Sequence, residues 1–100
     1  MPSRYQIGIN IQANGRRAII TGNCRPTAPE PITVYLDYAC DYSGSGSYVN
    51  SNELTFTSNG SSTVRKTINA PSGKNFSGGR ITSAYCEPES INGIPVVLDY

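Results

Sequence analysis

The sequence predicts an all-β domain, a sandwich of seven antiparallel strands, on three observations. Apolar and polar residues alternate in several short segments, and a period of two indicates a strand with one buried face. Gly, Pro and Asn separate these segments at intervals of about 8–12 residues, as in sandwich domains. No segment has the i, i+3, i+4, i+7 apolar spacing of a helix. The 100 residues fit a single domain, 1–100.

The clearest strand is Ile32–Cys40, and we place it at the centre of the sandwich. Its β-branched and aromatic residues are typical of strands. One face would carry Ile32, Val34, Leu36, Tyr38 and Cys40, and the other Thr33, Tyr35, Asp37 and Ala39. Tyr35 therefore marks either a sheet-face contact or an outward aromatic without a special role.

Two strands precede it. Tyr5–Gln12 alternates cleanly, and Ala13-Asn14-Gly15 is a strong hairpin signal that leads into the strand Arg16–Cys24. The connection Arg25–Pro31 holds three prolines, which lack a ladder donor, so we expect it to cross stiffly between sheets.

The four later strands are less regular. They are Tyr48–Thr57, Ser62–Ile68, Arg80–Glu87 and Pro95–Tyr100, and residues 41–47 and 70–79 are expected to be loops. Lys66 shares a face with Val64 and Ile68, so this strand is an edge, is bulged, or exposes Lys66 near its end. The predicted core consists of Ile9, Ile20, Val34, Leu36, Phe56, Val64, Ile81 and Val96.

Residues 32–68, with ITVYLDY, a Gly/Ser loop, LTFT and TVRKTI, resemble bacterial immunoglobulin-like modules of the Big and Calx-beta kind. The resemblance implies a seven-stranded antiparallel immunoglobulin-like β-sandwich with a stalk, adhesion or accessory role in surface or particle proteins. The calcium-binding activity of some Calx-beta domains is not carried over, because the seven acidic residues here are scattered.

The three cysteines have two interpretations. If the strands alternate in direction, the strands that Cys24 and Cys86 close finish at the same end of the sandwich, and Cys40 lies at the opposite end. A disulfide between them would correspond to the inter-sheet bridge of immunoglobulin domains. Alternatively, Cys24, Cys40 and Cys86 are reduced and act as small buried hydrophobes.

Catalysis is not expected. The chain has no His, so a Ser-His or Cys-His nucleophile is excluded. No C-x-x-C or H-x-x-H spacing predicts a metal site, and no cofactor is expected. Six carboxylates could form a pair in principle, but solvated roles are favoured: Asp37, Asp41, Glu53, Glu87, Glu89 and Asp99.

The net charge of +1 supplies no steering field for nucleic acid. Membrane insertion is not expected, because no apolar run approaches about 18 residues. We therefore predict a non-catalytic structural or protein-interaction module from a bacterial cell surface or a phage particle. Such a module lies outside the cell or in a virion, although no signal peptide is visible. The alternative is a carbohydrate-binding module that uses exposed Tyr rings.

Two surfaces are candidates for partners. The loops 13–15, 41–47 and 70–79 should meet at one end of the sandwich, which would collect Tyr42, Tyr48, Lys74, Asn75 and Phe76. Alternatively, Phe76 lies under its own loop and the tyrosines cover the core. Terminal strands are the second candidate, because neither Tyr5–Gln12 nor Ile94–Tyr100 is well protected as an edge. One of them is expected to pair with a second copy, a protein partner or a neighbouring module. The alternative is that the two terminal strands cover each other's edges or lie beside loops, which gives a monomer.

Overall fold

The computed structural model describes residues 1–100 and contains eight strands and no helix, so no helix is available to cross a membrane. The strands are β1 (Tyr5–Asn14), β2 (Arg17–Arg25), β3 (Ile32–Tyr42), β4 (Ser47–Phe56), β5 (Thr63–Asn69), β6 (Phe76–Glu87), β7 (Ser90–Ile91) and β8 (Ile94–Asp99). The all-β prediction is confirmed.

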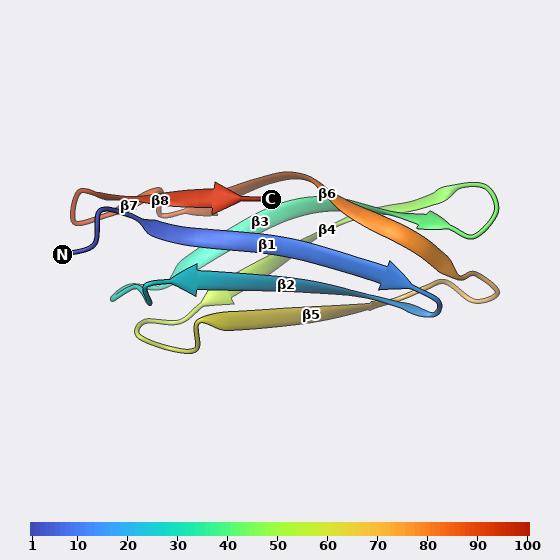
Figure 1. Ribbon diagram of the computed structural model, residues 1–100, viewed down its shortest axis with the longest axis horizontal. Coiled ribbons are helices and arrows are strands. Elements are labelled where there is room, and N and C mark those ends of the chain that lie inside the picture. Colours follow the sequence, from blue (N-terminus) through green and yellow to red (C-terminus); the bar gives the residue numbers. More distant parts are fainter.

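The strands form two sheets. One has five strands in the order β5-β2-β1-β8-β7, and the other has three in the order β4-β3-β6. β3 is hydrogen-bonded on both sides, so it is the central strand of its sheet, as its alternation indicated. The proline-rich segment after β2 carries the chain from the first sheet to the second (Figure 1).

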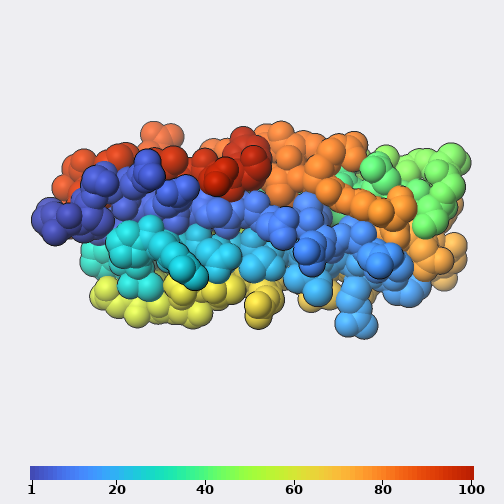
Figure 2. Space-filling view, in the orientation of Figure 1, coloured from blue at the N-terminus to red at the C-terminus, as the bar shows by residue number.

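The molecule is long and thin, with extents of 49 × 20 × 15 Å. Figure 2 shows β5, β2, β1 and β8 side by side along the long axis, and Figure 1 places three turns at one end. There Gly15 N–H donates to the carbonyl of Phe76 at 2.9 Å, and Ser43 N–H to that of Asn75 at 2.8 Å. Loops 13–15, 41–47 and 70–79 thus meet, as expected.

Most of the predicted core is confirmed. The inward faces of both sheets contribute to one cluster of 22 buried residues, and Ile9, Ile20, Val34, Leu36 and Phe56 belong to it. Three predicted core residues, Val64, Ile81 and Val96, are only partly buried against the cluster. They lie on β5, β6 and β8, where fewer neighbouring strands are available to cover them.

Bulges in β6 decide which of its side chains face inward. The pairing with β3 shifts between Asp37 and Tyr38 and again between Asp41 and Tyr42. Ser83 pairs with Asp37 whereas Ile81 pairs with Tyr38, so Thr82 is the extra residue. Because an inserted residue changes the parity of a strand, Ile81 and Cys86 both face the core. Phe76–Gly79, expected to be loop, is part of β6 and pairs with the end of β3.

The terminal strands differ from the prediction. The sequence indicated seven antiparallel strands, but β7 is an additional strand of only two residues, too short to show alternation. β8 runs parallel to β1, with Tyr5 opposite Val96 and Gly8 opposite Asp99. β1 therefore lies between β2 and β8 and is not an edge, so that half of the edge prediction is wrong. β1 and β8 each cover one edge of the other.

Gly22 sets how closely the sheets approach. A Cβ atom there would lie 2.7 Å from Leu54 Cδ1 and 3.1 Å from Phe56 Cζ, both in the opposite sheet. Leu54 and Phe56 are buried and have little room to move. Gly22→Ala should therefore destabilise the domain by about 1–3 kcal/mol through overpacking, as measured by chemical denaturation.

Gly8→Ala is the matched control, because nothing lies within 4 Å of a Cβ atom at that position on β1. We expect it to be neutral or slightly stabilising. Equal destabilisation by both substitutions would contradict the close approach of the sheets at Gly22.

Candidate functional site

The outward face of the β4-β3-β6 sheet carries an ordered set of polar and aromatic residues. Side chains directly opposite each other on paired strands share a face. One row across the sheet is therefore Glu53, Tyr35 and Tyr85, and the next is Ser51, Asp37 and Ser83. The same face continues through Thr33, Thr55 and Glu87 in one direction and through Ala39, Val49 and Arg80 in the other.

Two tyrosines stack on this face. The ring centroids of Tyr35 and Tyr85 are 5.1 Å apart with an interplanar angle of 25°. Tyr85 is 59% exposed and Tyr35 is partly exposed, so the pair presents aromatic surface to solvent. A cross-strand aromatic pair also stabilises a sheet, by about 0.5–1.5 kcal/mol. Stacking alone therefore does not require a ligand.

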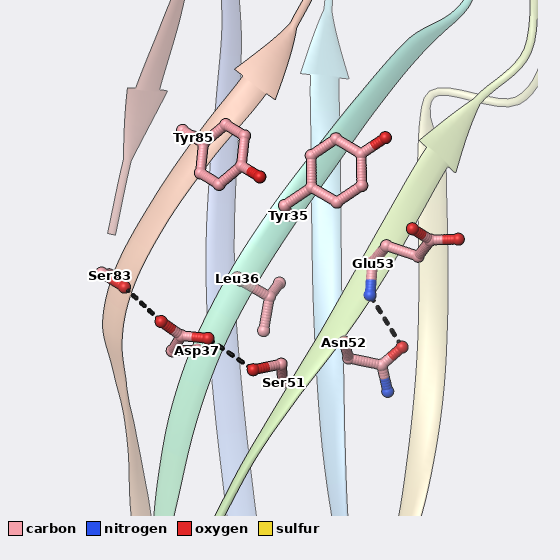
Figure 3. Close-up of a pocket in the computed structure, with 8 residues that line it drawn as sticks. All are labelled: Tyr35, Leu36, Asp37, Ser51, Asn52, Glu53, Ser83 and Tyr85. Carbon is pink, nitrogen blue, oxygen red and sulfur yellow. Dashed lines mark hydrogen bonds between the residues drawn. The ribbon is translucent and has the colours of Figure 1, made fainter.

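Asp37 is held beside the aromatic pair by two serines (Figure 3). Ser51 Oγ donates to Asp37 Oδ1 at 2.5 Å, and Ser83 Oγ donates to Oδ2 at 2.9 Å. These hydrogen bonds, first that from Ser51 and then that from Ser83, lower the pKa of Asp37 because they favour the charged carboxylate. Asp37 is thus a fixed, ionised acceptor on an exposed surface.

The two rows line the only pocket in the structure, an open hollow of about 430 Å³. Its lining residues are Tyr35, Leu36, Asp37, Ser51, Asn52, Glu53, Ser83 and Tyr85. Figure 3 shows the two rings side by side, with Asp37 between the two serines and Glu53 on the far side of Tyr35. The hollow combines an aromatic surface with hydroxyl, amide and carboxylate groups.

One of the two edge strands beside the hollow, β4, is partly protected against pairing with another chain. The backbone N–H groups of Ser51 and Glu53 donate to the side-chain oxygens of Asn50 and Asn52, both at 2.8 Å. These N–H groups would otherwise be free to bind an added strand. β4 consequently offers its face to a partner, whereas its edge is partly occupied.

The loop end predicted as an interaction surface is largely a closed end of the core. Phe76 is 1% exposed, so Phe76 is not available to a partner. Tyr42 stacks on it at 6.0 Å with an interplanar angle of 5°, and Tyr48 lies 6.2 Å from it. Lys74 Nζ is 5.2 Å from the Tyr42 ring centroid, and only Lys74 and Asn75 of the predicted residues are exposed.

The cysteines are free and buried in the structure, without the Cys24–Cys86 disulfide. Cys24 lies on β2 of one sheet and Cys86 on β6 of the other. Burial is the main cause that raises the pKa of each thiol, including Cys40. They act as small apolar side chains in the core, which is the second interpretation drawn from the sequence.

No group of three or more His, Cys, Asp or Glu side chains is arranged to hold a metal ion. Comparison of the chain with protein-family models, with curated proteins and with solved structures finds no match.

Sequence reasoning found part of this site. The alternation of β3 placed Tyr35, Thr33 and Asp37 together on the outward face, and the structure confirms it. Tyr85, Ser83 and Ser51 were missed as partners, because cross-strand register between segments 46 residues apart is not visible in one sequence. The available signal was the alternation of Tyr85 and Ser83 with Ala84 and Cys86.

The serines should set the ionisation of Asp37. We expect an Asp37 titration midpoint below the ordinary aspartate value of about 3.9, measured by carboxyl-carbon NMR. Replacing both serines, Ser51→Ala with Ser83→Ala, should raise this midpoint because the charged form loses its donors. Ser72→Ala, at an exposed turn, should leave it unchanged.

The sign of the stability effect follows from the lowered pKa. Asp37 contributes stability above its unfolded pKa, and this contribution is lost as the pH falls through the folded pKa. The serine variants should therefore show a smaller loss of stability in that acidic range. An unchanged Asp37 midpoint in the double variant would contradict the hydrogen-bonding account.

Proposed function

We propose that this protein is a non-catalytic carbohydrate-binding module whose ligand lies on the outward face of the β4-β3-β6 sheet. The observation that carries the proposal is the exposed Tyr35–Tyr85 pair beside Asp37 in the only pocket of the structure. The binding mode is a sugar ring against an aromatic surface, with its hydroxyl groups directed to the neighbouring polar side chains.

The aromatic pair suits the apolar face of a sugar. Axial C–H groups of a pyranose carry partial positive charge, and the face of a tyrosine ring is negative. The stacked pair is already ordered by its strands, so little side-chain entropy is lost on binding. Tyr85 lies on β6 and Tyr35 on β3, and a glycan could therefore extend across the strands.

The polar groups suit sugar hydroxyls. The Asp37 carboxylate accepts hydrogen bonds strongly, and the hydroxyl oxygens of Ser51 and Ser83, which donate to Asp37, can still accept from a sugar. A glycosidase needs one carboxyl group with a raised pKa as its general acid, and Asp37 does not supply that group because its pKa is lowered. We accordingly include the absence of glycosidic-bond cleavage in the proposal.

Two of the edge strands, β4 and β5, are poorly suited to pairing with another chain, which favours a face as the binding surface. In β4, the backbone N–H groups of Ser51 and Glu53 already donate to asparagine side chains. β5 carries the charged Arg65 and Lys66, which disfavour pairing with another strand. Of the two terminal strands, only β8 has an open side, because β7 covers just two of its residues. Pairing of β8 with a second copy or a protein partner is the remaining form of the edge hypothesis.

We propose that this module belongs to a cell-surface or phage-particle protein and that its fold is a variant of the immunoglobulin fold. β2 pairs with β5 and β3 with β6, which corresponds to strands B with E and C with F in immunoglobulin domains. The last strand differs, because β8 joins β1 instead of β6. Adhesion to a bacterial glycan would suit both a cell-surface stalk and a phage decoration protein.

A glycan array of neutral, amino and acidic sugars tests the function, followed by calorimetric titration of each hit. Tyr35→Ala and Tyr85→Ala should each weaken binding by about tenfold or more, or about 1.4 kcal/mol, since each removes half of the aromatic surface. Tyr85→Phe should retain most of the affinity, because it keeps the ring. The bound oligosaccharide should be recovered uncleaved.

Tyr100→Ala is the matched control, because Tyr100 is 58% exposed but lies outside the hollow. Thermal denaturation of each variant separates lost binding from lost folding. An array without a hit would dismiss the proposal. So would a hit whose affinity survives both tyrosine substitutions in folded protein.

A further inference from the structure

We infer that the Tyr35–Tyr85 hollow selects glycans that carry protonated amino groups and disfavours acidic glycans. This inference rests on the proposed function and concerns the class of sugar. The hollow and its aromatic pair define the site, and the charges around them determine the sign of the charge that a favoured ligand carries.

Three carboxylates surround the aromatic pair without a cationic partner. Glu53 is directly opposite Tyr35 on β4, Asp37 lies in the neighbouring row, and Glu87 lies in the row beyond Tyr35. The only salt bridge in the structure joins Arg80 and Asp41 at 3.2 Å, and Arg80 is opposite Ala39, further along β3. None of the three carboxylates is therefore neutralised within the protein.

The carboxylates act on the aromatic surface itself. Burial is the first cause that raises the pKa of Tyr35, and the nearby charges of Glu87 and Glu53 raise it further. Their negative potential thus reaches the ring on which a sugar would stack. An ammonium group near a tyrosine face is attracted by the ring and by these carboxylates together.

The charge of the hollow differs from that of the whole protein. The net charge is +1, yet the hollow holds no Lys or Arg. Arg17 and Arg25 on β2 and Arg65 on β5 are exposed on strands of the other sheet. A uronate or a sialylated chain would be repelled by the carboxylates at the hollow, so it would be attracted to the arginines of the other sheet instead.

The test compares three oligosaccharides of equal length with the intact protein. They are a fully deacetylated glucosamine hexamer, its N-acetylated counterpart and a hexamer of galacturonate. We expect binding in that order, with an advantage of about tenfold for the glucosamine hexamer at low salt. The advantage should shrink as salt screens the exposed charges.

Isosteric variants isolate the charge. Glu53→Gln and Glu87→Gln should each weaken binding of the glucosamine hexamer by up to about fivefold and leave the N-acetylated hexamer nearly unchanged. Asp99→Asn is the control, because Asp99 is an exposed carboxylate on β8 of the other sheet. Hexalysine is the control for simple polycation binding.

The outcomes separate this inference from the proposed function. If the N-acetylated hexamer binds as tightly as the glucosamine hexamer and depends on Tyr35 and Tyr85, the inference is wrong and the function stands. Preferential binding of galacturonate, or equal tyrosine-dependent binding of hexalysine, would also overturn it. If no glycan on the array binds, the proposed function fails, and the inference fails with it.

Discussion

The central constraint is that β3 is hydrogen-bonded to a strand on each side. A strand in that position has only two faces, because successive side chains alternate. Val34, Leu36 and Tyr38 take the inward face and are buried, whereas Tyr35 and Asp37 take the outward one. The packing that holds the core in register therefore also fixes the position of the candidate binding residues. A one-residue slip would exchange the two sets.

The loop end of the molecule and the outward face of the β4-β3-β6 sheet have different roles. At the loop end, Phe76 is buried under Tyr42 and Tyr48, and the backbones of Gly15 and Phe76 bond the two sheets together. Aromatic residues there close the core. On the β4-β3-β6 face, Tyr35 and Tyr85 pack on each other and keep part of their surface in water. That difference in exposure directs the functional interpretation to the face.

The sequence predicted those features that depend on local pattern. The alternation of Ile32–Cys40, the hairpin at Asn14-Gly15 and the sheet change after Arg25 are all present in the structure. Features that depend on distant segments were not predictable in this way. The extra residue Thr82 changes the parity of β6. β8 lies parallel to β1, although the two strands are at opposite ends of the sequence. The site shows the same division, since Tyr35 was located by alternation but its partner Tyr85 required the register of β6.

Backbone amide NMR with the tightest-binding oligosaccharide tests the central claim most directly. The account predicts chemical-shift changes concentrated at the residues that line the hollow, on β3, β4 and β6: Tyr35, Asp37, Ser51, Asn52, Glu53, Ser83 and Tyr85. Inward neighbours such as Val34 should change less. Changes centred on the loop end, at Tyr42 and Lys74, or on the outward residues of β2 and β5 would contradict it.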